Sequence, residues 1–378
     1  MIAAAPAGPV APVVARRQSR IRAFVEADIP EVARVHRAAF RIIGETAPDS
    51  YRDYFRSVFL GTHARNSVLP SLVHEESDGR ITGFVGVVPR RMVIGGRRYD
   101  AVVSSQFIVD PQSQVGLVAM RLAKGYLEGP QDLSIADEAN EVSRKIFEGL
   151  GGAAASLLSL YWTRPLRPAR LGLSMVQQRR RLAPFAVAAR PVASLADAVV
   201  ASVPGSPLRL CEPCVDHGDL SAPELLRHAR AASDAGSLRV EHDDHAFQWL
   251  LDRARRHGAG ARLLTGVVKN GSTIRGWYIA CIDRDGVADV AQLGADPASI
   301  HDVLDHLFYR AWQAGAISAT GRMDARFMQA LSDKHCVFHR RGPWVLIKSH
   351  HARLLHALQT GATSFSRFDG EWSLRYQP

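Results

Sequence analysis

Apolar and polar positions over residues 20–168 follow two alternating spacings, one typical of strands and one typical of helices. In order along the chain they predict a strand at 21–24, helices at 29–40 and 51–61, three strands within 71–110 with turns at 77–79 and 95–96, a helix at 115–125, a strand at 132–137, a helix at 139–152 and a strand within 155–168. We expect Asp28 to cap the first helix. This mixed order predicts an α/β fold around a partly parallel, mixed sheet.

A second unit repeats the later part of this order. It consists of a helix after residue 237, strands at 263–269, 275–282 and 288–293, a helix at 299–315, a strand at 316–320, a helix at 324–335 and a strand at 343–349. The repeat is one of architecture and not of residues. Residues 169–237 are rich in Ala, Arg, Pro and Ser and are expected to form a connector with one or two helices. We therefore predict two tandem domains, at 20–168 and 238–378.

Composition agrees with a folded protein of this size. The chain has 378 residues, 47% of them hydrophobic and 22% charged, and no apolar run approaches the roughly 20 residues of a membrane span. Residues 1–19 are Ala/Pro-rich, and their arginines follow the apolar part, unlike a secretory signal. We expect a flexible arm at 1–19. With only four cysteines, the chain is expected to be cytoplasmic.

The excess of basic residues favours some classes of partner without identifying one. Net charge is +10 with a pI of about 9.8, which favours anionic partners such as phosphorylated cofactors or an acidic acyl carrier protein. The arginines are scattered and no zinc-finger spacing or base-reading helix is present, so sequence-specific nucleic-acid binding is not expected. A solvated basic surface is the simpler explanation of the charge.

Chemistry is expected first at residues 107–125, where a strand runs directly into a helix. The free N–H groups at such a helix start favour phosphates, and Gly116 would let a pyrophosphate approach the main chain. An ordinary strand-to-helix turn explains the local sequence equally well.

Two motifs together resemble the GNAT acyltransferases (GCN5-related N-acetyltransferases). Val109, Asp110 and Pro111 resemble the family's V-x-P strand end, and Gln114 begins a loop like the one that holds the coenzyme A pyrophosphate. Leu117 stands where that loop usually has its first glycine. The family's later motif matches Asn140, Ser143, Phe147 and Gly151, with Phe147 at the position of a tyrosine that is thought to protonate the leaving thiolate in many relatives.

The resemblance implies an acyl-CoA site, with acetyl-CoA or another acyl-CoA as co-substrate. The residues it assigns to the cofactor are Phe107, Ile108, Val109, Gln114, Val115, Gly116, Leu117, Val118, Ala119, Asn140, Ser143 and Phe147. It also implies a bulge within 104–109 that separates this strand from the strand at 132–137, with the thioester in the gap and backbone N–H groups holding its oxygen.

An amine attacks only when neutral, so a base or water relay is required. Asp137 and Glu138 end the central strand and are the candidate bases, although both suit capping of the next helix equally well. Glu75 and Glu76 are reserve candidates.

No metal is predicted. Cys211, Cys214 and His217 could begin a zinc site, but no second ligand pair follows at finger spacing. His335, Cys336 and His339 offer a Cys-His arrangement, although spacing alone does not bring their side chains together.

The second unit is expected to be degenerate. Its corresponding turn has Asp296 and Pro297 where phosphate would bind, with Ser299 as a helix cap. The predicted function is acyl transfer from coenzyme A to a small-molecule amine. The alternatives are a long-chain acyl donor or acyl carrier protein, and a catalytically silent binding module.

Overall fold

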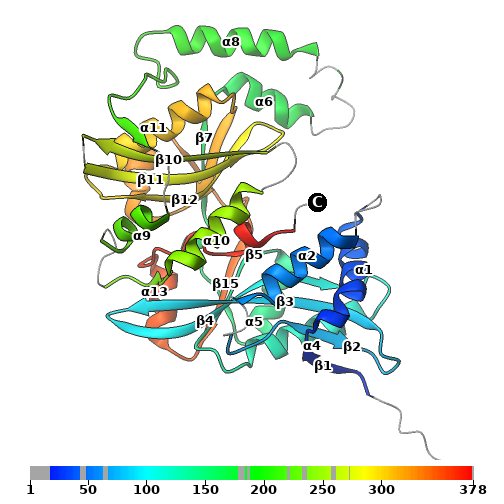
Figure 1. The fold of residues 1–378 in the computed structure, drawn as a ribbon. Helices are drawn as coiled ribbons and strands as arrows, with labels where there is room; N and C mark the ends of the chain where they lie inside the picture. Colours follow the sequence, from blue (N-terminus) through cyan, green and yellow to red (C-terminus); the bar gives the residue numbers. More distant parts are fainter. Residues whose placement is uncertain are drawn as a thin grey trace, which may run out of the picture.

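Strands of the chain form two mixed sheets in the computed structural model (Figure 1). The structure describes residues 18–376 except 43–47, 63–66, 178–183, 185–187, 219–221, 232–235, 257–260 and 272. The first sheet has the order β1 (Arg20–Ala23), β2 (Leu72–Glu75), β3 (Ile81–Ile94), β4 (Arg97–Val109), β5 (Leu133–Ala139), β15 (Trp344–Ser349) and β6 (Ala153–Ala154), with β9 (Arg239–Val240) paired to β3. The second has the order β14 (Val337–His339), β7 (Tyr161–Pro165), β13 (Ser318–Arg322), β12 (Val287–Ala295), β11 (Thr273–Ile282), β10 (Arg262–Asn270) and β8 (Asp216–Gly218). The predicted α/β class with two mixed sheets is confirmed.

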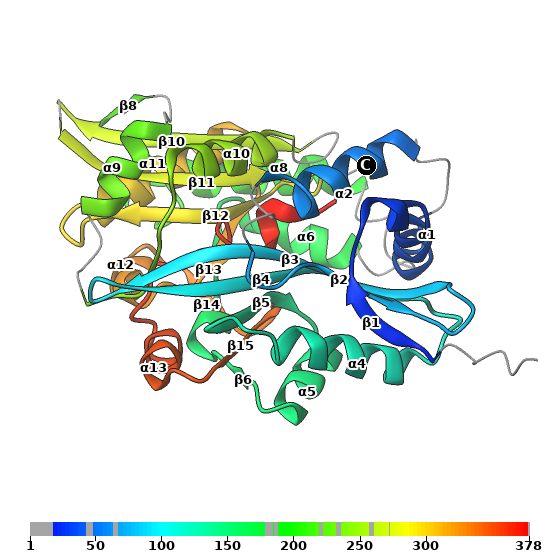
Figure 2. The ribbon, with the colours of Figure 1, turned by 60° about the horizontal axis from the view of Figure 1, so that its bottom comes forward.

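Helices cover the two faces of the first sheet differently. One face packs α4 (Val115–Leu127) and α5 (Glu141–Gly149) over Val85 and Val87 of β3. The opposite face packs α1 (Ile29–Phe40) and α2 (Pro48–Phe59) over Phe84 and Val88, because neighbouring strand residues point to opposite faces. Figure 2 shows α2 between the two sheets and α4 on the far side of the first sheet.

The core beneath α1 and α2 continues into the second half of the chain. It includes Phe247 and Leu250 of α10 (Asp244–Arg255) and Trp277 of β11. The second sheet is further covered by α11 (Ile300–Gln313), with α12 (Met328–Asp333) beside it and α13 (Ala352–Thr360) close to the first sheet. The two halves therefore share one apolar core across α1, α2 and α10.

One strand of each half pairs in the other half's sheet. We expected the strand within 155–168 to close the first sheet, but β7 pairs antiparallel with β13, from Tyr161↔Arg322 to Pro165↔Ser318. The strand at 343–349, expected in the second sheet, is β15 and pairs antiparallel with β5, from Trp344↔Ala139 to Ser349↔Leu133. An apolar run predicts a strand but does not name its partner. Neither sheet is built from one range alone, and the domain limits 20–168 and 238–378 stay predictions.

The connector holds more structure than expected. It contains α6 (Pro168–Gln177), α8 (Arg190–Ser202), β8 and α9 (Ala222–Ala231), where we predicted one or two helices. Asp197 of α8 accepts hydrogen bonds from the N–H groups of Ala169 and Arg170 at the start of α6 (2.8 and 3.0 Å). Across the described part of the chain, every helix is too short or too polar to span a bilayer.

Two further expectations concern the N-terminal region. Residues 1–17 of the predicted arm lie outside the described residues, so that prediction is untested. Asp28 does not cap α1, because its carboxylate accepts the N–H of Val25 (3.0 Å) and pairs with Arg22 (2.7 Å).

Candidate active site

The parallel strands β4 and β5 separate part of the way along their length. They pair from Ala101↔Leu133 to Val103↔Ile135 and no further. At the same level the pairing of β3 with β4 shifts register, so that two residues, Gln106 and Phe107, stand opposite Val85. This is a β-bulge, and the bulge expected within 104–109 is confirmed.

Tyr126 of α4 sits at the point of separation. Its hydroxyl lies 3.0 Å from the carbonyl oxygen of Val102 in β4 and 2.8 Å from that of Ile135 in β5. Burial raises the pKa of Tyr126 well above its usual value, so the hydroxyl stays protonated. The sequence reasoning did not identify this tyrosine, although it follows Leu122 on the buried face of α4.

Gln106, in the bulge, has the left-handed backbone conformation that non-glycine residues rarely adopt, with φ of 56°. Its side-chain oxygen lies 2.9 Å from Nε2 of His36, and its N–H donates to Oε1 of Glu371 at 2.9 Å. Burial lowers the pKa of His36 to about 4, so the ring is neutral and donates through Nε2 to Gln106. Nδ1 then accepts from Tyr51, at 3.3 Å. His36 is thus placed to hold the bulge.

A cavity of about 610 Å³ fills the gap between the separated strands. It is lined from α1, β4, α4, β5, α5 and the last residues of the chain, and it therefore reaches both faces of the first sheet. The lining residues include Phe40, Ser104, Gln106, Phe107, Tyr126, Ala136, Glu138, Asn140, Ser143, Phe147, Glu371 and Tyr376. Five of the predicted site residues therefore lie on one cavity, namely Phe107, Glu138, Asn140, Ser143 and Phe147.

The start of α4 is open to solvent and carries no acid. Its first turn has no acidic residue, and no side chain caps it at Gln114. Val115 and Leu117 are each 46% exposed, and a Cβ on Gly116 would meet no atom within 4 Å. Val118 and Ala119 are buried against the sheet, so of the predicted loop residues these two belong to the core. The Val115 N–H donates to the Ser113 carbonyl at 2.9 Å, and the N–H groups of Gly116 and Leu117 that follow it suit an anion.

Asp110 fixes the turn that leads into α4. It is buried, and its carboxylate accepts the N–H of Gln112 at 3.0 Å and pairs with Arg34 at 2.8 Å. Burial opposes ionisation, but the Gln112 N–H and the Arg34 guanidinium outweigh it and lower the pKa of Asp110. The negative charge of Asp110 is therefore compensated by Arg34 and the Gln112 N–H, and it does not lie at the start of α4.

On α5, Asn140 caps the helix by accepting the N–H of Ser143 at 2.9 Å. Phe147 is buried, with its ring 6.1 Å from that of Tyr126. The predicted acyl-CoA residues of α5 thus face the cavity from the side opposite β4.

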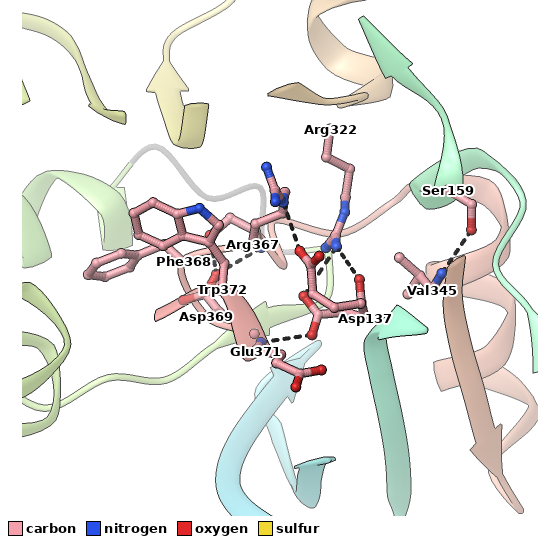
Figure 3. Close-up of polar contacts among 12 residues, drawn as sticks. Asp137, Ser159, Arg322, Val345, Arg367, Phe368, Asp369, Glu371 and Trp372 are labelled. Atoms are coloured by element: carbon pink, nitrogen blue, oxygen red, sulfur yellow. Dashed lines mark hydrogen bonds and ion pairs between the residues drawn. The ribbon is translucent and has the colours of Figure 1, made fainter. Parts of the chain in front are cut away.

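Asp137 and Glu138 belong to β5 and not to a helix cap, so the capping alternative is wrong. Asp137 is buried beside the cavity and pairs with Arg322 of β13 at 3.1 Å, while its second oxygen accepts the N–H of Glu371 at 2.8 Å (Figure 3). Burial raises the pKa of Asp137. Glu138 pairs with Arg367 at 3.0 Å and with Arg375. These ion pairs join the first sheet to the second and to the last residues of the chain.

Glu371 is the carboxyl group that sequence reasoning missed. It begins the short turn η4 (Glu371–Leu374), and its Oε1 accepts from the Gln106 N–H and, at 3.3 Å, from the Ser105 hydroxyl. Burial, with added repulsion from the charges of Asp137 and Glu138, raises its pKa to about 8. The reserve candidates lie elsewhere: Glu75, in β2, pairs with Arg20 and Arg22 of the edge strand β1.

A second bulge and separation occur in the second sheet. β12 and β13 pair in parallel from Val287↔Ser318 to Val290↔Gly321, and the shift against β11 leaves Ala291 unmatched. Here the cavity is only about 110 Å³, and the Phe368 N–H donates to the Ala291 carbonyl at 3.1 Å. The last segment of the chain thus occupies the second gap.

The corresponding helix start differs from that of α4. Ser299 precedes α11 but does not cap it, because its hydroxyl lies 3.4 Å from the Arg275 guanidinium and makes no cap hydrogen bond. Asp296, as predicted from the sequence, stands in the turn before it.

Among the described residues, no group of three or more His, Cys, Asp or Glu side chains is arranged to hold a metal ion. Cys211 and Cys214 are exposed. Burial raises the pKa of Cys336 to about 12, so its thiol is protonated and a poor nucleophile.

This geometry, with parallel strands that part beside a bulge and a helix opening at the end of the first, defines a fold of the GNAT class. Comparison with solved structures agrees. A GCN5-related N-acetyltransferase from Anabaena variabilis superposes with a TM-score of 0.58, 10% identity, and coverage of 90% of this chain and 75% of that one. A probable N-acyltransferase from Enterococcus faecalis superposes with a TM-score of 0.57 and 11% identity, covering 91% of this chain and 74% of that one.

A GCN5-related N-acetyltransferase from Kribbella flavida gives a TM-score of 0.52 at 16% identity, with 88% of this chain and 71% of that one covered. No protein-family model and no curated protein matches the sequence. At these identities the likeness is one of fold, and the chain has the GNAT fold.

Proposed function

We propose that this protein transfers an acyl group from an acyl-CoA to an amine. The observation that carries the proposal is the cavity of about 610 Å³ that passes between β4 and β5 and is lined by Ala123 and Tyr126 of α4. The acid-free start of α4, which lies outside this lining, is the proposed site for the pyrophosphate. Neighbours of the same fold are described as N-acetyltransferases or a probable N-acyltransferase, which supports the same chemistry.

The donor would lie on the α4 and α5 side of the first sheet. N–H groups at Gly116 and Leu117 would face the pyrophosphate, and the pantetheine arm would follow β4 along residues 107–109 toward the bulge. Acetyl-CoA or another short acyl-CoA is the proposed donor. The comparisons give no support for an acyl carrier protein, which is not part of the proposal.

The acceptor would enter from the opposite face and lose a proton before or during attack. Glu138 and Glu371 are the cavity's two carboxylates, and both are candidates for the base. Glu138 is engaged by two guanidinium groups, those of Arg367 and Arg375. Glu371, with a pKa of about 8, is better matched to deprotonating an amine near neutral pH, and we favour it. Asp137 would then position Glu371 through its N–H.

Departure of the thiolate would need no acid from the protein. Phe147 stands beside the cavity without an ionisable group, and a free thiol has a pKa near 8.5. The protein would therefore contribute to catalysis by positioning the reactants and excluding water, more than by acid catalysis.

The test has two steps on the full chain. Calorimetric titration with CoA measures donor binding, and release of free thiol from acetyl-CoA in the presence of an amine panel measures transfer. Binding with amine-dependent thiol release supports the proposal. Binding without transfer to any amine would favour the silent binding module, for which the departures at Leu117 and Phe147 are the evidence, and absence of CoA binding would overturn the donor site.

A further inference from the structure

A second large cleft adjoins the cavity on the acceptor side. It measures about 620 Å³ and lies between α2, α10 and the last residues of the chain. Arg375 and Tyr376 line both the cleft and the cavity, so the two spaces adjoin at these residues. A molecule bound in the cleft would have one end directed at Glu371.

The lining of the cleft is strongly basic. It carries Arg56, Arg253, Arg256 and Arg375 against the single carboxylate of Asp53, a formal balance of +3 from four positive charges and one negative. Some buried arginines of the protein are paired with carboxylates, as Arg367 is with Glu138 and Asp289, whereas others, such as Arg90, donate to main-chain carbonyls. Arg56 and Arg375 are paired with Glu26 and Glu138 outside the lining, so the positive charge available to a ligand in the cleft belongs to Arg253 and Arg256.

Arg253 is the least compensated of these residues. In the part of the chain that the structure describes, it has no carboxylate partner. Its guanidinium donates to the main-chain carbonyls of Ser373 at 3.3 Å and Arg375 at 3.0 Å, and it lies 5.2 Å from the ring centre of Tyr54. Burial lowers its pKa, and repulsion from Arg256 adds to the effect. A cation held out of water without an opposite charge is unfavourable, and a bound anion would remove that cost.

From this cleft we propose that the acceptor amine carries an anionic group, a carboxylate or a phosphate, which Arg253 and Arg256 bind. The inference rests on the proposed acyl transfer and names the class of its acceptor. Guanidinium groups bind both anions through paired hydrogen bonds, and the same charges repel polyamines and other purely cationic acceptors. Binding at the anionic end would place the amine toward the cavity, where Glu371 lies.

The experiment compares amines that differ only in charge. Acetyl-CoA is the donor, and the pairs are glycine with glycinamide, β-alanine with β-alaninamide, and phosphoethanolamine with ethanolamine, with putrescine as the dication. We expect kcat/KM to be at least about tenfold higher for the anionic member of each pair that is used. Comparison of kcat/KM between the two carboxylate pairs and the phosphate pair shows which of the two anions the cleft prefers. Equal use of neutral and anionic members would overturn the inference.

Variants assign the preference to the cleft. Arg253→Met and Arg256→Gln should each reduce kcat/KM for anionic amines by about tenfold, with the KM for acetyl-CoA unchanged. Arg256 is exposed and follows the last residue of α10, so it serves if Arg253→Met folds poorly. Arg255→Gln is the matched control, because Arg255 lies on the same helix, is exposed and pairs with Asp252 outside the cleft. An equal loss in Arg255→Gln would count against the cleft.

A binding measurement keeps this inference separate from the activity. Inorganic phosphate and acetate should raise the melting temperature of the wild type more than that of Arg256→Gln, whether or not any tested amine is acylated. Equal stabilisation of both proteins by both anions would exclude the cleft as an anion site. Failure to bind CoA, by contrast, would remove the proposed function while leaving the anion result standing.

Discussion

Replacing Glu371 with glutamine tests the proposed base and the electrostatics of the cavity together. In the wild type, Oε1 accepts from the Gln106 N–H at 2.9 Å and from the Ser105 hydroxyl at 3.3 Å. A glutamine oxygen can accept both hydrogen bonds, so Glu371→Gln keeps the shape of the neutral side chain and removes only its ability to ionise.

The size of the effect follows from the shift in pKa. Burial, together with Asp137 and Glu138, raises the pKa of Glu371 from 4.5 to about 8. The folded state binds the Glu371 proton more tightly than the unfolded chain does, so protonated Glu371 adds to the free energy of unfolding. This contribution is complete below pH 4.5 and is lost as the pH rises toward 8. The pKa shift of Glu371 sets an upper limit of roughly 5 kcal/mol on this contribution to the free energy of unfolding. Solvent at the open side of the cavity makes the contribution smaller. Glu371→Gln has no such loss, and we expect it to be more stable than the wild type by about 1–3 kcal/mol at pH 8.5 and similar to it at pH 5.

Two measurements check this expectation. Melting temperatures from pH 5 to pH 9 should diverge as the pH rises, with the variant several degrees higher at the alkaline end. Turnover should fall by about a hundredfold while CoA affinity is unchanged, and the wild-type rate should rise with pH toward 8. Glu148→Gln, at an exposed residue of α5, is the control. A difference in melting temperature that does not depend on pH would refute the electrostatic reasoning, and full activity in Glu371→Gln would refute its role as base.

Three further predictions follow from the same geometry. Gly116→Glu should keep the fold, since its Cβ would meet open space, but should weaken CoA binding by more than about a hundredfold in calorimetry, whereas Gly116→Ala should not; equal affinity in all three proteins would move the phosphate site elsewhere. Glu138→Gln should lower both turnover and melting temperature because it leaves the buried Arg367 less compensated, and a roughly hundredfold loss of turnover at unchanged melting temperature would instead identify Glu138 as the base. Calorimetry of the full chain should give one CoA per chain, because the second gap measures only about 110 Å³, and a stoichiometry of two would contradict this.

The order of helices and strands along the chain was predictable, because the spacing of apolar residues that indicates each element is a local property of the sequence. The helix expected at 115–125 is α4 (Val115–Leu127), and the strand expected at 132–137 is β5 (Leu133–Ala139). The pairing of β7 and β15 was not predictable, since both are short apolar runs that suit either sheet. Their partners depend on contacts between residues far apart in the sequence.

The predicted donor side depends on residues 107–147, which are contiguous and carry recognisable motifs, and it stays a prediction. The acceptor side was not predictable, because Glu371 reaches Gln106 across 265 positions and Arg253 lies on a helix with no motif of its own. One signal was present: Glu371 stands between Gly370 and Trp372, an acid in an apolar segment near the end of the chain. Gly370 is required there, because a Cβ would lie 1.9 Å from Oδ2 of Asp137.

The last residues of the chain start from the first sheet. β15 lies beside β5 and ends at Ser349, opposite Leu133, at the end of β5 that still pairs with β4, and the chain then runs through α13 to residues 361–376. That chain then contacts both bulges in turn, with the Phe368 N–H on the Ala291 carbonyl and Glu371 on the Gln106 N–H. The segment that fills the second gap therefore also delivers a carboxyl group to the first, which explains why, among the described residues, the second gap holds only about 110 Å³ while the first holds about 610 Å³.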